Sequence, residues 1–97
     1  IQVYDGPCYY VPNAFSPNGD GLNDIFRVIP VGIYRTDWFR VFNRYGQLVF
    51  ETNQWLKGWD GSFMGKKQPV GNYVWMVKGV DRNGKLVEMK GTVMIVQ

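Results

Sequence analysis

A short polar segment carries oxygen-bearing residues at a spacing that could bind a divalent cation. Residues 16–27 read Ser-Pro-Asn-Gly-Asp-Gly-Leu-Asn-Asp-Ile-Phe-Arg. If Gly21 takes the sharp-turn position of a loop that coordinates calcium, four neighbours fall on oxygen-ligand positions. They are Asn18 and Asp20 through side chains, Leu22 through its carbonyl, and Asp24 at the later position that often acts through water.

Two positions of this segment do not fit a tight calcium site. Ser16 stands where the first acid is expected, and Arg27 stands where a bidentate glutamate belongs. Two interpretations therefore stay open. One is a weak calcium site of extracellular type, with a dissociation constant on the order of 10⁻⁴–10⁻³ M. The other is a metal-free loop whose Asn and Asp side chains bond neighbouring backbone N–H groups. No cofactor is required by either.

Catalytic equipment is sparse in this sequence. The chain of 97 residues has no histidine and one cysteine, Cys8. Histidine is the commonest general base, and a lone cysteine without a histidine lacks its usual activator. Asp24 and Asp60 are the tempting pair of carboxylates, but both sit in turn-like segments. We expect that this protein is not an enzyme.

Charge and hydropathy narrow the class of partner. The net charge is +3, and Lys66 and Lys67 are the adjacent pair in an otherwise scattered set of cations. A nucleic-acid module would need a basic stripe or a known motif, so no nucleic-acid partner is expected. Apolar runs stay well short of the roughly 18 residues that span a bilayer, so no membrane span is expected.

The elements that must position these residues are short strands separated by turns. Glycine, proline and asparagine recur along the chain, and helical periodicity is absent. We predict an all-β, immunoglobulin-like antiparallel β-sandwich of about seven strands. The expected strands are 9–11, 25–29, 37–43, 47–51, 72–80, 85–90 and 92–96.

Several boundaries follow from local signals. Pro30 is expected to end the strand 25–29, and residues 31–36 and 62–68 are expected to be connections. Gly91 is expected to mark a bulge or bend between the last two strands. Residues 1–8 are either a linker or a first strand, and residues 9–97 form the domain.

The segment 71–77 predicts how one long strand is anchored. In immunoglobulin-like sandwiches, a tyrosine corner places a tyrosine two residues before an inward core position. Here Tyr73 takes the corner and Trp75 takes the core position, so Tyr73, Trp75 and Val77 should face inward. Of the other tryptophans, Trp59 is expected to pack in a turn, and Trp38 and Trp55 are unassigned.

The chain also resembles a known family. Its segments 12–26, 41–51, 58–61, 69–75 and 91–93 read PNAFSPNGDGLNDIF, VFNRYGQLVFE, GWDG, PVGNYVW and GTV. In this order they are similar to the gliding motility-associated C-terminal domain, the type B sorting domain of the type IX secretion system of Bacteroidetes. The resemblance covers residues 9–97. Tyr45 stands where that family usually has tryptophan, so an aromatic ring is retained.

The resemblance implies a C-terminal sorting signal. Such a domain directs its parent protein through the periplasm and the type IX system to the outer-membrane surface or the medium. The implied partners are the translocon and an outer-membrane protein of PorP/SprF type, and the isolated domain is expected to be a monomer. Lys66, Lys67 and Lys90 are the candidate translocon contacts. The alternative is an extracellular carbohydrate-binding or adhesive module, because four tryptophans could supply ring platforms.

Overall fold

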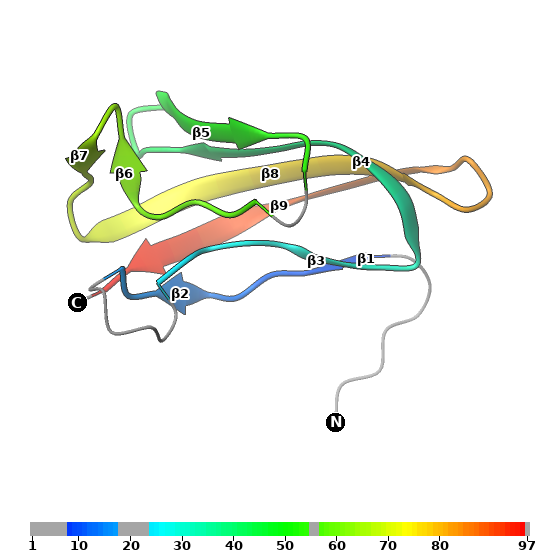
Figure 1. Ribbon diagram of the computed structural model, residues 1–97, viewed down its shortest axis with the longest axis horizontal. Helices are drawn as coiled ribbons and strands as arrows, with labels where there is room; N and C mark the ends of the chain where they lie inside the picture. The colour runs from blue at the N-terminus through cyan, green and yellow to red at the C-terminus, as the bar shows by residue number, and fades with distance from the viewer. Residues whose placement is uncertain (1–7, 18–23, 55–56, 97) are drawn as a thin grey trace.

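The structure, a computed structural model, describes residues 8–17, 24–54 and 57–96 (Figure 1). These residues form strands and connections, without a helix, as the sequence predicts. The strands are β1 (Cys8–Tyr10), β2 (Ala14–Phe15), β3 (Ile29–Val31), β4 (Ile33–Phe42), β5 (Leu48–Thr52), β6 (Ser62–Phe63), β7 (Lys66–Lys67), β8 (Gly71–Asp81) and β9 (Leu86–Ile95).

Five strands make the main sheet, in the order β2-β9-β8-β4-β5. Its three central strands are long, and a shorter layer formed by the antiparallel pair β1–β3 lies against one face (Figure 1). The small hairpin β6–β7 stands at one end. This arrangement is compatible with the expected immunoglobulin-like sandwich.

The core lies between the main sheet and the β1–β3 layer. Side chains on β8 alternate with the period of two that a half-buried strand requires. Tyr73, Trp75 and Val77 are buried, whereas Asn72 and Val74 are exposed. The prediction that these three residues face inward is confirmed. The rest of the buried apolar set is Tyr9, Phe15, Phe26, Val28, Phe39, Val41, Val49, Trp59, Val93 and Ile95.

Two hairpins connect the long strands, and both use the same side-chain device. The Asn43 carboxamide oxygen accepts hydrogen bonds from the backbone N–H of Tyr45 and Gln47, each at 2.9 Å. In the β8–β9 hairpin, an Asp81 carboxylate oxygen accepts from Asn83 and Lys85 at 2.8 and 2.9 Å. Such bonds replace backbone partners that the turn would otherwise leave unpaired.

The segment before β4 differs from the prediction. A strand over 25–29 is wrong, because only Phe26 makes a bridge there and β3 begins at Ile29. Pro30 lies inside β3 and does not end it. Since β3 pairs only with β1, a proline without an N–H is tolerated at this edge. Gly32 alone separates β3 from β4, so residues 31–36 are not a connection.

The last strand is continuous, and Gly91 is not a bulge. β9 pairs with β8 in unbroken register from Leu86 to Ile95, with Gly91 opposite Trp75. A Cβ atom at position 91 would approach Cζ2 of Trp75 to 2.9 Å. The glycine is therefore required by the indole ring that packs over the backbone of β9.

Two short pairings were not predicted. β2 pairs in parallel with the end of β9, so the sandwich is not wholly antiparallel. Residues 62–68, expected to be a loop, contain the hairpin β6–β7. Strands of two residues carry no measurable alternation, so sequence periodicity cannot reveal them.

Candidate recognition site

The segments that carry the family resemblance meet in one aromatic cluster. Phe15 and Phe26, which flank the polar segment 16–24, stack with ring centroids 5.6 Å apart. Trp59 lies 5.6 Å from Phe15 and 5.2 Å from Tyr73, both measured between ring centroids. All four rings are buried. Four aromatic residues from the segments that carry the resemblance therefore build part of the core.

A pair of backbone hydrogen bonds ties this cluster together. Phe26 N–H donates to the carbonyl of Trp59, and Trp59 N–H donates to the carbonyl of Phe26, both at 2.8 Å. This bridge joins the end of the polar segment to the turn at residues 58–61. Two segments that are distant in sequence are thereby fixed beside each other.

Asp60, one of the two tempting carboxylates, has a structural role. One of its carboxylate oxygens accepts hydrogen bonds from the backbone N–H and the hydroxyl of Ser62, at 3.0 and 2.6 Å. The indole N–H of Trp59 donates to the Ser62 carbonyl at 2.7 Å. These bonds fold a compact turn around a buried tryptophan.

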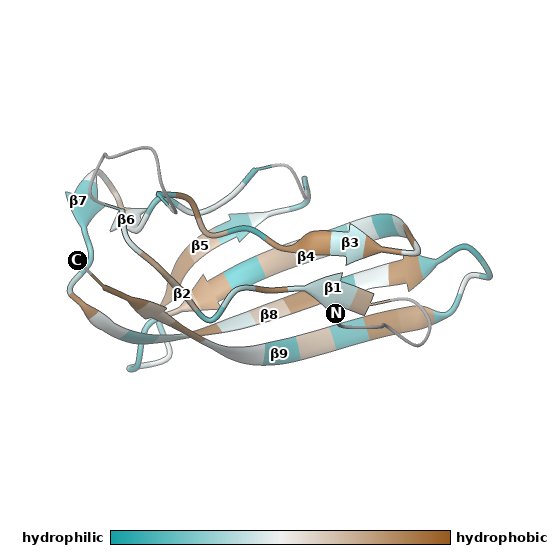
Figure 2. Cartoon of the chain, turned by 90° about the horizontal axis from the view of Figure 1, so that it is seen from below, coloured by the Kyte–Doolittle hydropathy of each residue, from teal (hydrophilic) through white to brown (hydrophobic). Residues whose placement is uncertain are grey.

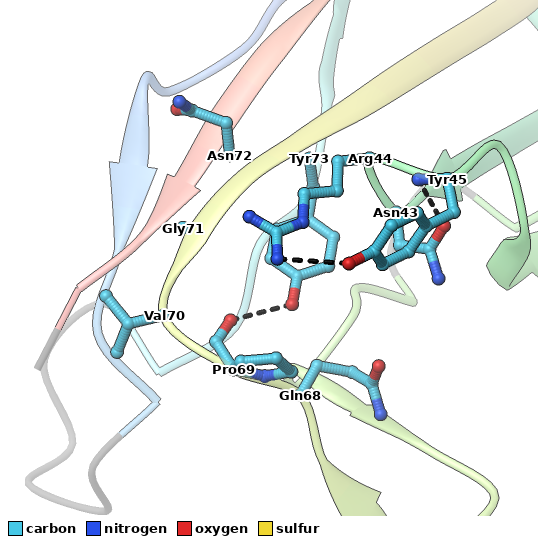
Figure 3. A pocket seen from close by; sticks show the side chains of 9 residues that line it. All are labelled: Asn43, Arg44, Tyr45, Gln68, Pro69, Val70, Gly71, Asn72 and Tyr73. Atoms are coloured by element: carbon cyan, nitrogen blue, oxygen red, sulfur yellow. Dashed lines mark hydrogen bonds between the residues drawn. The ribbon is translucent and has the colours of Figure 1, made fainter.

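The predicted tyrosine corner is present. The hydroxyl of Tyr73 donates to the carbonyl of Pro69 at 2.7 Å (Figure 3). Burial raises the pKa of Tyr73 above its ordinary value of 10.0, and the charge of Arg44 partly opposes that shift. The neutral hydroxyl is the form that donates this bond, so the corner is held at neutral pH.

A shallow cavity of about 220 Å³ opens above the corner, between the β4–β5 turn and the start of β8 (Figure 3). Arg44 is its charged group, with the guanidinium 5.2 Å from the ring centroid of Tyr45. Arg44 also donates to the hydroxyl of Tyr45 at 3.1 Å. The residues that line the cavity include neither a carboxylate nor a thiol.

The calcium candidates are only partly within the described residues. Asn18, Asp20 and Leu22 lie outside them, and Asp24 lies inside, half-buried. Over 8–17, 24–54 and 57–96, no group of three Asp, Glu, Cys or His side chains is placed to hold a metal. Calcium binding by the segment stays a prediction.

The three candidate lysines are on two different sheets. Lys66 and Lys67 form β7 of the small hairpin and are exposed. Lys90 is exposed on β9, where it pairs with Met76 of β8. The structure therefore keeps Lys66 and Lys67 together and places Lys90 apart from them.

The described tryptophans do not form a sugar platform. Trp59 and Trp75 are buried, with 1% and 6% of their surface exposed. Trp38 is half-buried, and the guanidinium of Arg40 lies 4.1 Å from its ring centroid. Trp55 is outside the described residues. None of these three rings favours the carbohydrate-binding alternative.

The fold and this site define a β-domain in which Phe15, Phe26, Trp59 and Tyr73 pack together in the core. The model of the CHU_C type IX secretion signal domain matches residues 9–95. The chain therefore belongs to this family. No curated protein matches the chain.

Membership of the family fixes the function at a coarse level. The domain is a sorting signal that directs secretion of its parent protein by the type IX system, to the cell surface or the medium. The family is a secretion signal and not a catalytic family. In the part of the chain that the structure describes, no helix has the length and apolar character needed to cross a membrane.

Proposed function

We propose that an outer-membrane protein of PorP/SprF type recognises this domain as a folded object, and that the domain has no catalytic role of its own. The observation that supports this is the burial of Phe15, Phe26, Trp59 and Tyr73. Residues in a core cannot be read directly by a partner. The signature then specifies a fold, and the partner reads the surface that this fold presents.

We further propose that Lys66 and Lys67 contribute charge to that surface. They are adjacent, exposed and held on a two-residue strand at one end of the molecule (Figure 1). A fixed pair of cations attracts an acidic surface and speeds the encounter with it. Lys90 remains a separate candidate contact on β9.

The test uses a neutral periplasmic reporter fused to this chain in a bacterium with a working type IX system. The intact fusion is expected at the cell surface, and the reporter alone is expected in the periplasm. Pull-down of the solubilised fusion should recover a PorP/SprF-type protein. Retention of the intact fusion in the periplasm would refute the sorting role for this chain.

Charge reversal then tests the lysines. Lys66→Glu with Lys67→Glu should reduce surface delivery without changing the melting temperature, because exposed charges contribute little to stability. Lys90→Glu is tested separately, and Lys85→Glu serves as a control on an exposed turn. Delivery that equals the parent in the double variant would remove Lys66 and Lys67 from the contact surface.

A further inference from the structure

One long strand of the main sheet has an edge that the described strands leave largely open. β9 pairs with β8 over its whole length of ten residues. On its other side, β2 pairs only with Met94 and Ile95. None of the strands in the described ranges pairs with the remaining edge, from Leu86 to Val93. In Figure 2, β9 runs along the lower margin of the sheet, and β2 lies beside its end only.

The hydrogen-bonding groups on this edge can be located from the pairing with β2. Met94 N–H donates to the Asn13 carbonyl at 2.9 Å, and Val96 N–H donates to the Phe15 carbonyl at 3.0 Å. Alternate N–H groups of a strand point the same way, and β9 has no bulge. The N–H groups of Glu88, Lys90 and Thr92 therefore point outward from the open edge of β9, away from β8.

Over the described residues, the ladder between the β2 segment and β9 ends at Asn13. Going backwards from β2, Val11 would be the next residue to turn its backbone groups toward β9, but it belongs to no described strand. The preceding strand, β1, pairs with β3 in the other layer instead. β1 therefore makes no strand pairing with β9, although the Tyr9 N–H contacts the Sδ atom of Met89 on β9 at 3.3 Å.

A cleft of about 400 Å³ lies between the segment leading into β2 and the sheet, and residues 9–13 line it together with Trp75 and Met89. Apolar side chains and polar groups both line this cleft, and Trp75 itself is buried, with 6% of its surface exposed. The cleft lies beside the row of strand donors on β9.

We infer that the open edge of β9 accepts an extended segment of the outer-membrane partner, which adds a strand to the main sheet. The pairing continues the ladder that β2 begins, and alternate side chains of the added strand face the cleft. The matching segment carries an apolar residue for the cleft. On its other face it carries a basic residue opposite Glu88 and an acidic residue opposite Lys90.

This inference rests on the proposed recognition by an outer-membrane protein, and the test separates the two. Thr92→Pro removes an edge N–H while sparing the bonds between β8 and β9. Thr92→Ala is the matched control, because it shortens the side chain and keeps the N–H. Surface delivery of the reporter fusion should fall about tenfold in Thr92→Pro relative to Thr92→Ala, as expected for loss of a buried backbone bond.

A second pair of variants protects the test against misfolding. Glu88→Pro and Glu88→Ala repeat the comparison at the far end of the edge, with melting temperatures measured for all four. Delivery by a folded proline variant that equals its alanine control overturns the inference. If both proline variants unfold, amide hydrogen exchange in the unaltered chain decides. Fast exchange at Glu88, Lys90 and Thr92 supports an open edge, and slow exchange at these residues overturns it.

Two further outcomes concern recognition as a whole and pairing between two copies of the chain. If the unaltered fusion is not delivered, recognition itself fails, whatever the edge does. If sedimentation shows that the unaltered chain is a dimer and Thr92→Pro makes it a monomer, the edge is occupied by a second copy, and the inference of a partner strand is overturned.

Discussion

Tyr73 makes two different contacts through one side chain. Its ring packs against Trp59 in the core, and its hydroxyl reaches back to Pro69. The bond closes the chain between the end of the small hairpin and the start of β8. A residue that appears in the signature as a simple aromatic therefore also sets the path of the backbone.

Removing the hydroxyl tests this role. Tyr73→Phe keeps the ring and loses the bond, so the free energy of unfolding should fall by about 0.5–1.5 kcal/mol. Tyr45→Phe is the control, because Tyr45 is 80% exposed and its hydroxyl bonds only a neighbouring arginine. Urea unfolding with unchanged slope measures both. Equal midpoints for the two variants would show that the corner bond contributes nothing.

The same burial predicts a loss of stability in alkali. Burial raises the pKa of both Tyr9 and Tyr73 above 10.0, although the Tyr9 bond to Thr36 opposes this in part. Above pH 10 the unfolded chain releases these protons before the folded chain does. The stabilisation is therefore complete below pH 10 and is lost as the pH rises through the raised values.

Unfolding by urea at pH 8 and at about pH 10.5 measures this effect. The midpoint should fall in the parent and fall less in Tyr73→Phe, which has one fewer buried phenol. A drop of the same size in both would assign the alkaline loss to other groups.

At the scale of elements, the contact between β8 and β9 depends on a ring packed over a strand. Trp75 covers Gly91, and Tyr73 and Val77, two residues away on either side along β8, face the same core. Gly91→Ala should destabilise the domain by about 1–3 kcal/mol, since the new methyl group forces the ring or the strand to move. In the Trp75→Phe background the same change should cost less, because the smaller ring leaves room.

A double-mutant cycle measured by urea unfolding gives the coupling between the two positions. Additive costs would show that Gly91 is needed for a reason other than the indole ring. Trp75→Ala, which empties the core position altogether, should cost about 3–5 kcal/mol.

Elements with local signals could be predicted from sequence, and those defined by distant partners could not. The hairpin turns after Asn43 and Asp81, the corner at Tyr73 and the long strands have turn residues and alternation in their own sequence. β2 is a strand only because Met94 and Ile95 lie beside it. The sequence predicts that Pro30 ends a strand, whereas the structure pairs it with Tyr9 of β1 at an edge.

For the candidate site, the residue types could be predicted from the sequence, but the strands that bring those residues together could not. The sequence predicted the buried tryptophans and the corner from residue type, and the choice of the lysines as contacts stays a prediction. It could not show that Lys66 and Lys67 lie on a different sheet from Lys90, because that depends on the pairing of β7 with β6. The open edge of β9 was likewise hidden, since it results from where β1 finds its partner.

At the scale of the whole molecule, the calcium prediction becomes a question of stability. If Asn18, Asp20, Leu22 and Asp24 bind calcium in the folded state alone, calcium at 100 times its dissociation constant adds about 2.7 kcal/mol to stability. The melting temperature should then rise with millimolar calcium, and Asp20→Ala should abolish the rise. Magnesium at the same concentration is the ionic control. A melting temperature that does not change with calcium concentration would favour the metal-free loop.

The parallel pairing of β2 with β9 also determines how the domain carries mechanical load. Tension between the segment that enters β2 and the segment that leaves β9 pulls the two strands along their axes in opposite directions. The bonds from Met94 and Val96 are then loaded in shear and must break together, whereas a peeling load would break them in turn. We therefore expect the domain to resist unfolding when an attached cargo applies force to it.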